Sequence, residues 1–161
     1  MKNKLYYILI ATALIFYGCD SNDGECRKDL TVKMGVALYQ MVYNSETGTF
    51  NQQTYTTKLT VYGLNNDSIL YKEKELSSFE VPLKKTEPFA QFVLKTESSS
   101  DTITVLYTNT ETFISLECGC QVTHALVLAT TTINAIDSVG IRAENVTTTG
   151  ETHLNVYYHV K

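Results

Sequence analysis

The chain lacks tryptophan, and it has only two prolines and three histidines among its 161 residues. Several enzyme signatures are missing as well: there is no G-x-S-x-G nucleophile motif, no H-E-x-x-H zinc motif and no glycine-rich phosphate loop. These absences argue against serine hydrolases, zinc metalloproteases and nucleotide-binding enzymes of the common types. We therefore predict that the protein is not an enzyme and uses no cofactor.

Positive charge is also scarce. The chain has 13 Lys and Arg residues against 17 Asp and Glu residues, a net charge of −4, and the basic residues form no cluster. Proteins bind nucleic acid largely by neutralising phosphates with Lys and Arg. We therefore expect no nucleic-acid partner.

One long apolar run stands at the N-terminus. Two lysines precede the uncharged residues 5–18, which is the layout of a secretory signal peptide. The run is shorter than the roughly 20 residues that a membrane-spanning helix needs. It ends at Gly18 and Cys19, a pair that resembles the processing site of bacterial lipoproteins. We expect a signal peptide at residues 1–18 and a lipid on Cys19; an ordinary signal peptide or an uncleaved anchor is the alternative.

Removing residues 1–18 leaves 143 residues with 11 basic and 17 acidic side chains, a net charge of −6. This length suits one domain with its own core. Residues 19–29 begin with an acidic stretch that has almost nothing to bury, so we expect a flexible tether there. Residues 30–161 would then form the folded domain, held at a membrane through the lipid on Cys19.

The body of the chain is rich in Thr, Val, Ile, Tyr and Phe, and it shows no sustained helical period. Turn-forming residues recur about every ten positions. We expect an all-β fold, a single antiparallel β-sandwich, immunoglobulin-like or related, of about eight or nine strands. Residues 44–54 are expected to form a polar loop, and residues 113–131 one bent strand or two. The alternating residues expected in the core include Met34, Val36 and Leu38; Phe79, Val81 and Leu83; Ala90, Phe92 and Leu94; and Leu154, Val156, Tyr158 and Val160.

Three cysteines remain besides Cys19, and an exported protein is expected to form a disulfide from them. A bond between Cys118 and Cys120 would be strained, because a single glycine separates them. We expect Cys26 to pair with one of the two; we favour Cys118, with Cys120 as the alternative, and the third thiol free or buried. Closing a loop of about 90 residues stabilises a fold by roughly 4–5 kcal/mol in the chain-entropy model.

Histidine and cysteine side chains are also candidate metal ligands. Cys118, Cys120 and His124 share one face of an unbroken strand, and thiolate with imidazole suits zinc or copper. A strand spreads these residues over about 20 Å, so we predict no metal site. His153 and His159 have the parity opposite to the core residues of the last strand. We expect both on the solvent face.

An aspartate followed by Ser or Thr and an aliphatic residue occurs three times. The pattern resembles the O-glycan acceptor of exported Bacteroidota proteins. The alternative is structural, because Asp-Ser and Asp-Thr often end a turn just before a strand. The candidate acceptors are Ser68, Thr102 and Ser138.

Five segments carry a wider resemblance: "LTVYGLNNDSILY", "VPLKK", "FISLECGC" followed by His124, "NAIDSVGI" and "HLNVYYHV". On these, the chain resembles a family of uncharacterised Bacteroidota lipoproteins, each with a signal peptide and one β-rich domain of unknown function. The resemblance implies an extracytoplasmic lipoprotein in which a cysteine near the start pairs with one in the "ECGC" region. It also implies an accessory role beside an outer-membrane β-barrel, and it implies no catalytic residues.

We therefore expect a non-catalytic, lipid-anchored binding or assembly module of the cell envelope. It would sit at the outer membrane, on the periplasmic face or at the cell surface, with an outer-membrane protein as its partner. The alternative is a surface lipoprotein that binds a glycan or another ligand. In that case the eleven tyrosines would replace the missing tryptophan as the platform for a sugar.

Overall fold

The computed structural model describes residues 26, 30–65 and 68–159. No helix long and apolar enough to cross a membrane occurs in this part of the chain. Eleven strands occur in it, and the predicted all-β fold is confirmed. The strands are β1 (Lys33–Asn44), β2 (Thr49–Thr54), β3 (Thr57–Gly63), β4 (Ile69–Leu76), β5 (Ser78–Pro82), β6 (Phe89–Lys95), β7 (Ser100–Ser115), β8 (Gly119–Thr131), β9 (Ile136–Ile141), β10 (Asn145–Val146) and β11 (Thr152–Tyr158).

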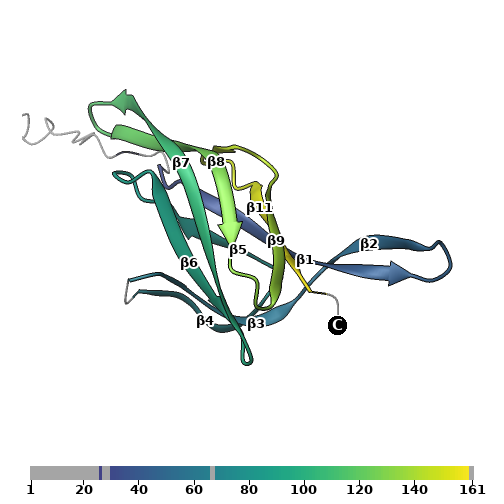
Figure 1. Ribbon diagram of the computed structural model, residues 1–161. Coiled ribbons are helices and arrows are strands. Elements are labelled where there is room, and N and C mark those ends of the chain that lie inside the picture. The colour runs from purple at the N-terminus through teal and green to yellow at the C-terminus, as the bar shows by residue number, and fades with distance from the viewer. Residues whose placement is uncertain (1–25, 27–29, 66–67, 160–161) are drawn as a thin grey trace, which may run out of the picture.

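The strands form two sheets that pack into the predicted β-sandwich (Figure 1). One sheet has the order β2-β1-β11-β9, with β5 also paired to β1, and the other has the order β10-β8-β7-β6-β3-β4. Strands β1 and β11 pair in parallel, with Val36 beside Leu154 and Leu38 beside Val156, whereas the other recorded pairs are antiparallel. The first and last strands therefore lie side by side at the centre of one sheet.

The core consists of the inward-facing residues of both sheets. Alternating positions of β1, β5, β6 and β11 are buried, as their sequences predict, because successive side chains of a strand point to opposite faces. Of the core residues named from the sequence, only Val160 lies outside the described residues. The predicted core residues that are buried are Met34, Val36, Leu38, Phe79, Val81, Ala90, Phe92, Leu94, Leu154, Val156 and Tyr158, with Leu83 after β5; Ala37, Val93 and His153 are buried in these strands as well.

One segment differs from the sequence-based expectation, and for a second the structure decides between one bent strand and two in favour of two. Residues 44–54 were expected to form a polar loop but contain β2, all six residues of which are exposed. A strand without a core face has no apolar alternation that could reveal it. The apolar residues 113–131 contain a turn, since β7 ends at Ser115 and β8 begins at Gly119, whose φ of 68° suits glycine.

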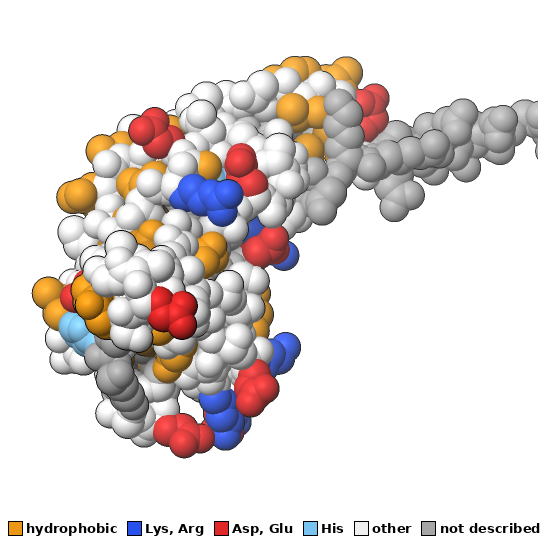
Figure 2. Space-filling view, turned by 90° about the vertical axis from the view of Figure 1, so that its right-hand side faces the viewer, with side chains coloured by type: hydrophobic (Ala, Val, Ile, Leu, Met, Phe, Trp, Pro, Cys, Tyr) orange, Lys and Arg blue, Asp and Glu red, His pale blue; other side chains and the backbone are white. Residues whose placement is uncertain are grey.

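Two hairpins extend beyond the sandwich at opposite ends (Figure 1). Past Gln40, β2 is the one described strand that pairs with β1, so residues 41–52 form a two-stranded projection, which we call the arm. The tip of the β7–β8 hairpin, residues 110–123, extends from the other end and is called the distal hairpin. Seen from the side of the arm, acidic and basic side chains are interspersed rather than gathered in one patch (Figure 2).

Candidate functional site

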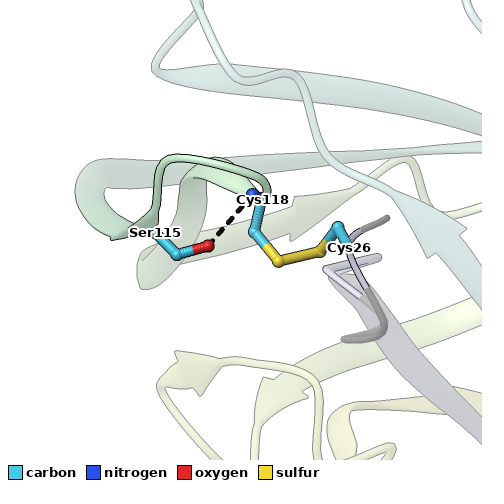
Figure 3. Close-up of a disulfide and its surroundings, with 3 residues drawn as sticks. All are labelled: Cys26, Ser115 and Cys118. Atoms are coloured by element: carbon cyan, nitrogen blue, oxygen red, sulfur yellow. Dashed lines mark hydrogen bonds between the residues drawn. A yellow bond between two sulfur atoms is a disulfide. The ribbon is translucent and has the colours of Figure 1, made fainter. Parts of the chain in front are cut away.

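The distal hairpin is covalently attached to the start of the domain. Cys26 and Cys118 form a disulfide across 92 residues of sequence, with their Cα atoms 4.7 Å apart. Cys118 lies in the turn between β7 and β8, where its N–H donates to Ser115 Oγ at 3.1 Å (Figure 3). This is the pairing that the sequence favoured over Cys26–Cys120. It ties Cys26, the first described residue after the expected anchor at Cys19, to the end of the hairpin.

Cys120, the second residue of β8, is an exposed free thiol. Its hydrogen bond to the Glu111 carboxylate, together with desolvation and the charge of that carboxylate, raises the pKa of the thiol. Because the thiolate is the reactive form, this environment keeps Cys120 in its less nucleophilic state at neutral pH.

His124 belongs to a buried hydrogen-bonded cluster on β7 and β8. Its side chain is 4% exposed, and its Nδ1 lies 2.7 Å from Asn109 Oδ1. The ring packs edge-on against Tyr107 at 5.2 Å between centroids. Burial, and then the positive charge of Lys85, lower the pKa of His124, which keeps the ring neutral.

The same cluster fixes the loop between β5 and β6. The Tyr107 hydroxyl accepts the Lys84 N–H at 2.9 Å, and Asn109 Nδ2 donates to the Lys85 carbonyl at 2.9 Å and to the Glu87 carbonyl at 3.0 Å. The burial of Tyr107 is consistent with its sequence position, because Tyr107 has the parity of the buried Ile103 in the same strand. In the described part of the chain, no three His, Cys, Asp or Glu side chains converge in a way that could hold a metal ion.

His153 is a correction, because the sequence placed it on the solvent face and the structure buries it completely, at 0% exposure. In the parallel pair, Gly35 aligns with Thr152 and Val36 with Leu154, so His153 is the extra residue of a bulge. A bulge breaks the two-residue alternation on which the prediction rested. His159 is exposed as expected, with Nδ1 3.6 Å from Asp137 Oδ1.

The buried imidazole of His153 fixes the pairing of the first and last strands. Its Nδ1 accepts a hydrogen bond from the Gly35 N–H at 3.0 Å. Burial lowers the pKa of His153, and the charges of Glu151 and Glu80 and the Asn145 carbonyl oppose this only in part. The ring is therefore held neutral, with Nδ1 available as an acceptor.

The three candidate O-glycosylation residues lie in different environments. Ser68 and Ser138 are exposed, whereas Thr102 is half-buried in β7. The aspartate before Thr102 is 2% exposed and accepts hydrogen bonds from the chain that follows β8. Asp101 therefore has a structural role. The lipidation candidate Cys19 lies outside the described residues.

The arm presents aromatic side chains to solvent. Tyr43 is 54% exposed and Phe50 is 60% exposed, and their rings pack against each other at 5.2 Å between centroids. The turn of the arm is ordered by Asn44: its side chain accepts the Glu46 N–H at 2.9 Å, and its carbonyl accepts the Gly48 N–H at 2.9 Å. A two-stranded ribbon is marginally stable in water by itself. The arm is thus an ordered aromatic surface without a third strand.

Comparison with known proteins places the chain in a family. The match covers residues 58–158, from β3 to the end of β11. The chain belongs to DUF6452, a family of unknown function. Cys118 and most of the sandwich lie within the matched region, while Cys26, β1 and β2 precede it. A search of the curated proteins and a search of the solved structures each found no significant match.

Proposed function

We propose that this DUF6452 protein is a non-catalytic, lipid-anchored binding or assembly module of the cell envelope, accessory to an outer-membrane protein. The observation that carries the proposal is the arm, an ordered ribbon with two exposed aromatic residues. It lies at the end of the molecule opposite the distal hairpin (Figure 1), whose turn holds the Cys26–Cys118 disulfide.

The division between the two ends supports this function. A lipid on Cys19 would lie seven residues before Cys26, which is bonded to the distal hairpin. The anchor would then act at one end of the sandwich and leave the arm free at the other. Aromatic residues are enriched at the core of protein–protein interfaces. A partner that covers Tyr43 and Phe50 would also supply the packing that the two-stranded ribbon lacks.

The test is a tagged pull-down of the lipidated protein from its own membranes in mild detergent, with mass spectrometry of the proteins that co-purify. The wild-type protein is expected to retain an outer-membrane protein in stoichiometric amount. A variant carrying both Tyr43→Ala and Phe50→Ala is expected to lose it, because burial of exposed aromatic residues dominates many interfaces.

Leu128→Ala is the matched control, because Leu128 is 48% exposed on β8, away from the arm. It should retain the partner at the wild-type level. A lipoprotein that purifies alone, or a partner held equally by the arm variant, would contradict the proposal.

A further inference from the structure

A pocket of about 720 Å³ opens at the end of the sandwich where the arm begins. Gln40, the last β1 residue paired with β11, lines it, as do Tyr55 after β2 and Tyr158 at the end of β11. The turn between β6 and β7 and the connection from β8 to β9 complete the wall. Both sheets therefore contribute, and the volume lies in the range of small-ligand sites.

Two residues that line this pocket carry a buried hydroxyl group with no hydrogen-bond partner among the described residues. One hydroxyl belongs to Tyr158, whose side chain is 6% exposed, and the other is Ser99 Oγ. Burying a hydroxyl without a partner is unfavourable, so polar groups of this kind are normally satisfied. Burial, and then electrostatic interaction with Tyr55 and Asp101, raise the pKa of Tyr158 above its ordinary value, so the hydroxyl keeps its proton and can donate.

The pocket also offers an aromatic surface. The rings of Tyr55 and Tyr158 lie 4.7 Å apart between centroids with a tilt of 39°. Tyr55 is half-buried, so part of its ring is accessible from the pocket. Tyrosine combines an apolar ring with a polar tip, and it therefore suits a ligand that has apolar faces and hydroxyl groups at its edge.

The charge of the lining does not favour an anion. Lys58 is the lysine of this lining, and its Nζ lies 3.3 Å from Glu97 and 3.8 Å from Glu73. Glu75 adds another carboxylate. The rest of the wall carries mainly hydroxyl and amide groups, from residues such as Thr57, Ser98 and Asn134. The groups present match a neutral, polyhydroxylated molecule.

We infer that this pocket binds one or two units of a neutral saccharide, with a sugar ring against Tyr55 and sugar hydroxyls bonded to the Tyr158 hydroxyl and Ser99 Oγ. The inference does not rest on the proposed function, because the surface and the ligand differ from those of the arm. It gives two buried hydroxyls the partners that the described residues do not supply.

The test uses the full chain purified from its membranes in a detergent without a sugar head group. An array of neutral mono- to hexasaccharides built from glucose, galactose, mannose, fucose, xylose and N-acetylglucosamine identifies the ligand. Calorimetric titration with the best oligosaccharide then compares Tyr158→Phe and Ser99→Ala with the wild type. We expect saturable binding that each variant weakens about tenfold, the loss of roughly one hydrogen bond.

Tyr62→Phe is the matched control, because it removes the hydroxyl of a half-buried tyrosine in β3 that does not line this pocket. It should bind the saccharide as the wild type does. A fold control accompanies the titration: Tyr158→Phe should unfold at the same urea concentration as the wild type or higher, because the hydroxyl it removes has no partner among the residues that the structure describes. Absence of binding by every neutral saccharide, undiminished binding by Tyr158→Phe, or marked destabilisation of that variant would each overturn the inference.

Discussion

At the residue scale, Asp101 shows how one buried carboxylate organises a connection. Its Oδ1 accepts from Thr132 Oγ1 and the Asn134 N–H, both at 2.8 Å, and its Oδ2 accepts from the N–H groups of Ala135 at 2.8 Å and Ile136 at 3.2 Å. These bonds fix the chain between β8 and β9. The carboxylate thus supplies hydrogen-bond acceptors for four donor groups that would otherwise have to bond to water.

We predict that Asp101→Asn lowers the free energy of unfolding by about 2–4 kcal/mol, because an amide nitrogen would face two backbone N–H donors. Urea unfolding measures the loss. The exposed Asp137 is the matched control, and Asp137→Asn should change stability by less than about 0.5 kcal/mol. Equal effects of the two variants would show that Asp101 does not organise the connection.

The same variant should alter the dependence of stability on pH. Burial raises the pKa of Asp101, but the hydrogen bonds from Ala135, Asn134, Thr132 and Ile136 together outweigh it, and the pKa lies below its ordinary value. The unfolded chain therefore binds the proton first as the pH falls, and this stabilisation is lost from about pH 5 downward. Wild-type stability should decline more steeply than that of Asp101→Asn between about pH 5 and pH 2, as followed by urea unfolding at each pH.

At the element scale, the parallel pairing of β1 with β11 depends on Gly35. A Cβ at this position would overlap the Glu151 carbonyl oxygen and lie 3.3 Å from Thr152 Cα. Because glycine has no side chain, β1 and β11 can approach closely at this position. The adjacent bulge brings His153 Nδ1 to the Gly35 N–H, from which it accepts a hydrogen bond. The junction between the first and last strands therefore needs both residues.

We predict that Gly35→Ala destabilises the fold by about 1–3 kcal/mol, because backbone atoms of β11 would have to move. Gly140→Ala is the matched control, since the nearest atom to its added Cβ is Tyr157 Cε2 at 4.0 Å. That variant should remain within about 0.5 kcal/mol of the wild type. Urea unfolding compares the two, and similar losses in both would show that the close approach at Gly35 is not limiting.

At the scale of the whole molecule, the two hairpins differ in how they are held. A disulfide ties the distal hairpin to the start of the domain. The arm is held by the hydrogen bonds of its turn and by the packing of the Tyr43 ring against the Phe50 ring. Leu116, at the end of the distal hairpin, is 90% exposed. With a lipid on Cys19, a chain of seven residues would hold this hairpin within about 25 Å of the bilayer.

This orientation predicts how close two fluorescent probes lie to the bilayer when the lipidated protein is bound to vesicles. A fluorophore introduced through a non-natural amino acid at Leu116 should be quenched by head-group spin-labelled lipids more strongly than one at Ser45 in the arm. Cys26→Ser breaks the attachment, so the difference should shrink in that background. Equal quenching of the two positions in the disulfide-bonded protein would contradict an anchor at the distal end.

How much was predictable differs between the fold and the candidate sites. The core faces of β1, β5, β6 and β11 followed from local alternation, which needs no knowledge of the partner strand. Asp101 was predictable in principle, because it shares the parity of Ile103 and Val105. His153 was not, because its bulge arises from the register between strands that lie more than a hundred residues apart.

The sequence by itself determined the strand-rich fold, the two-sheet core and the short list of cysteines that could pair. Each of these depends on residue type and on periodicity over a few positions. Tertiary structure alone decided the parallel β1–β11 pairing, the burial of His153, the projection of the arm and the pocket with Tyr158 and Ser99. These features depend on which distant segments meet and in which register, and a local pattern does not contain that information.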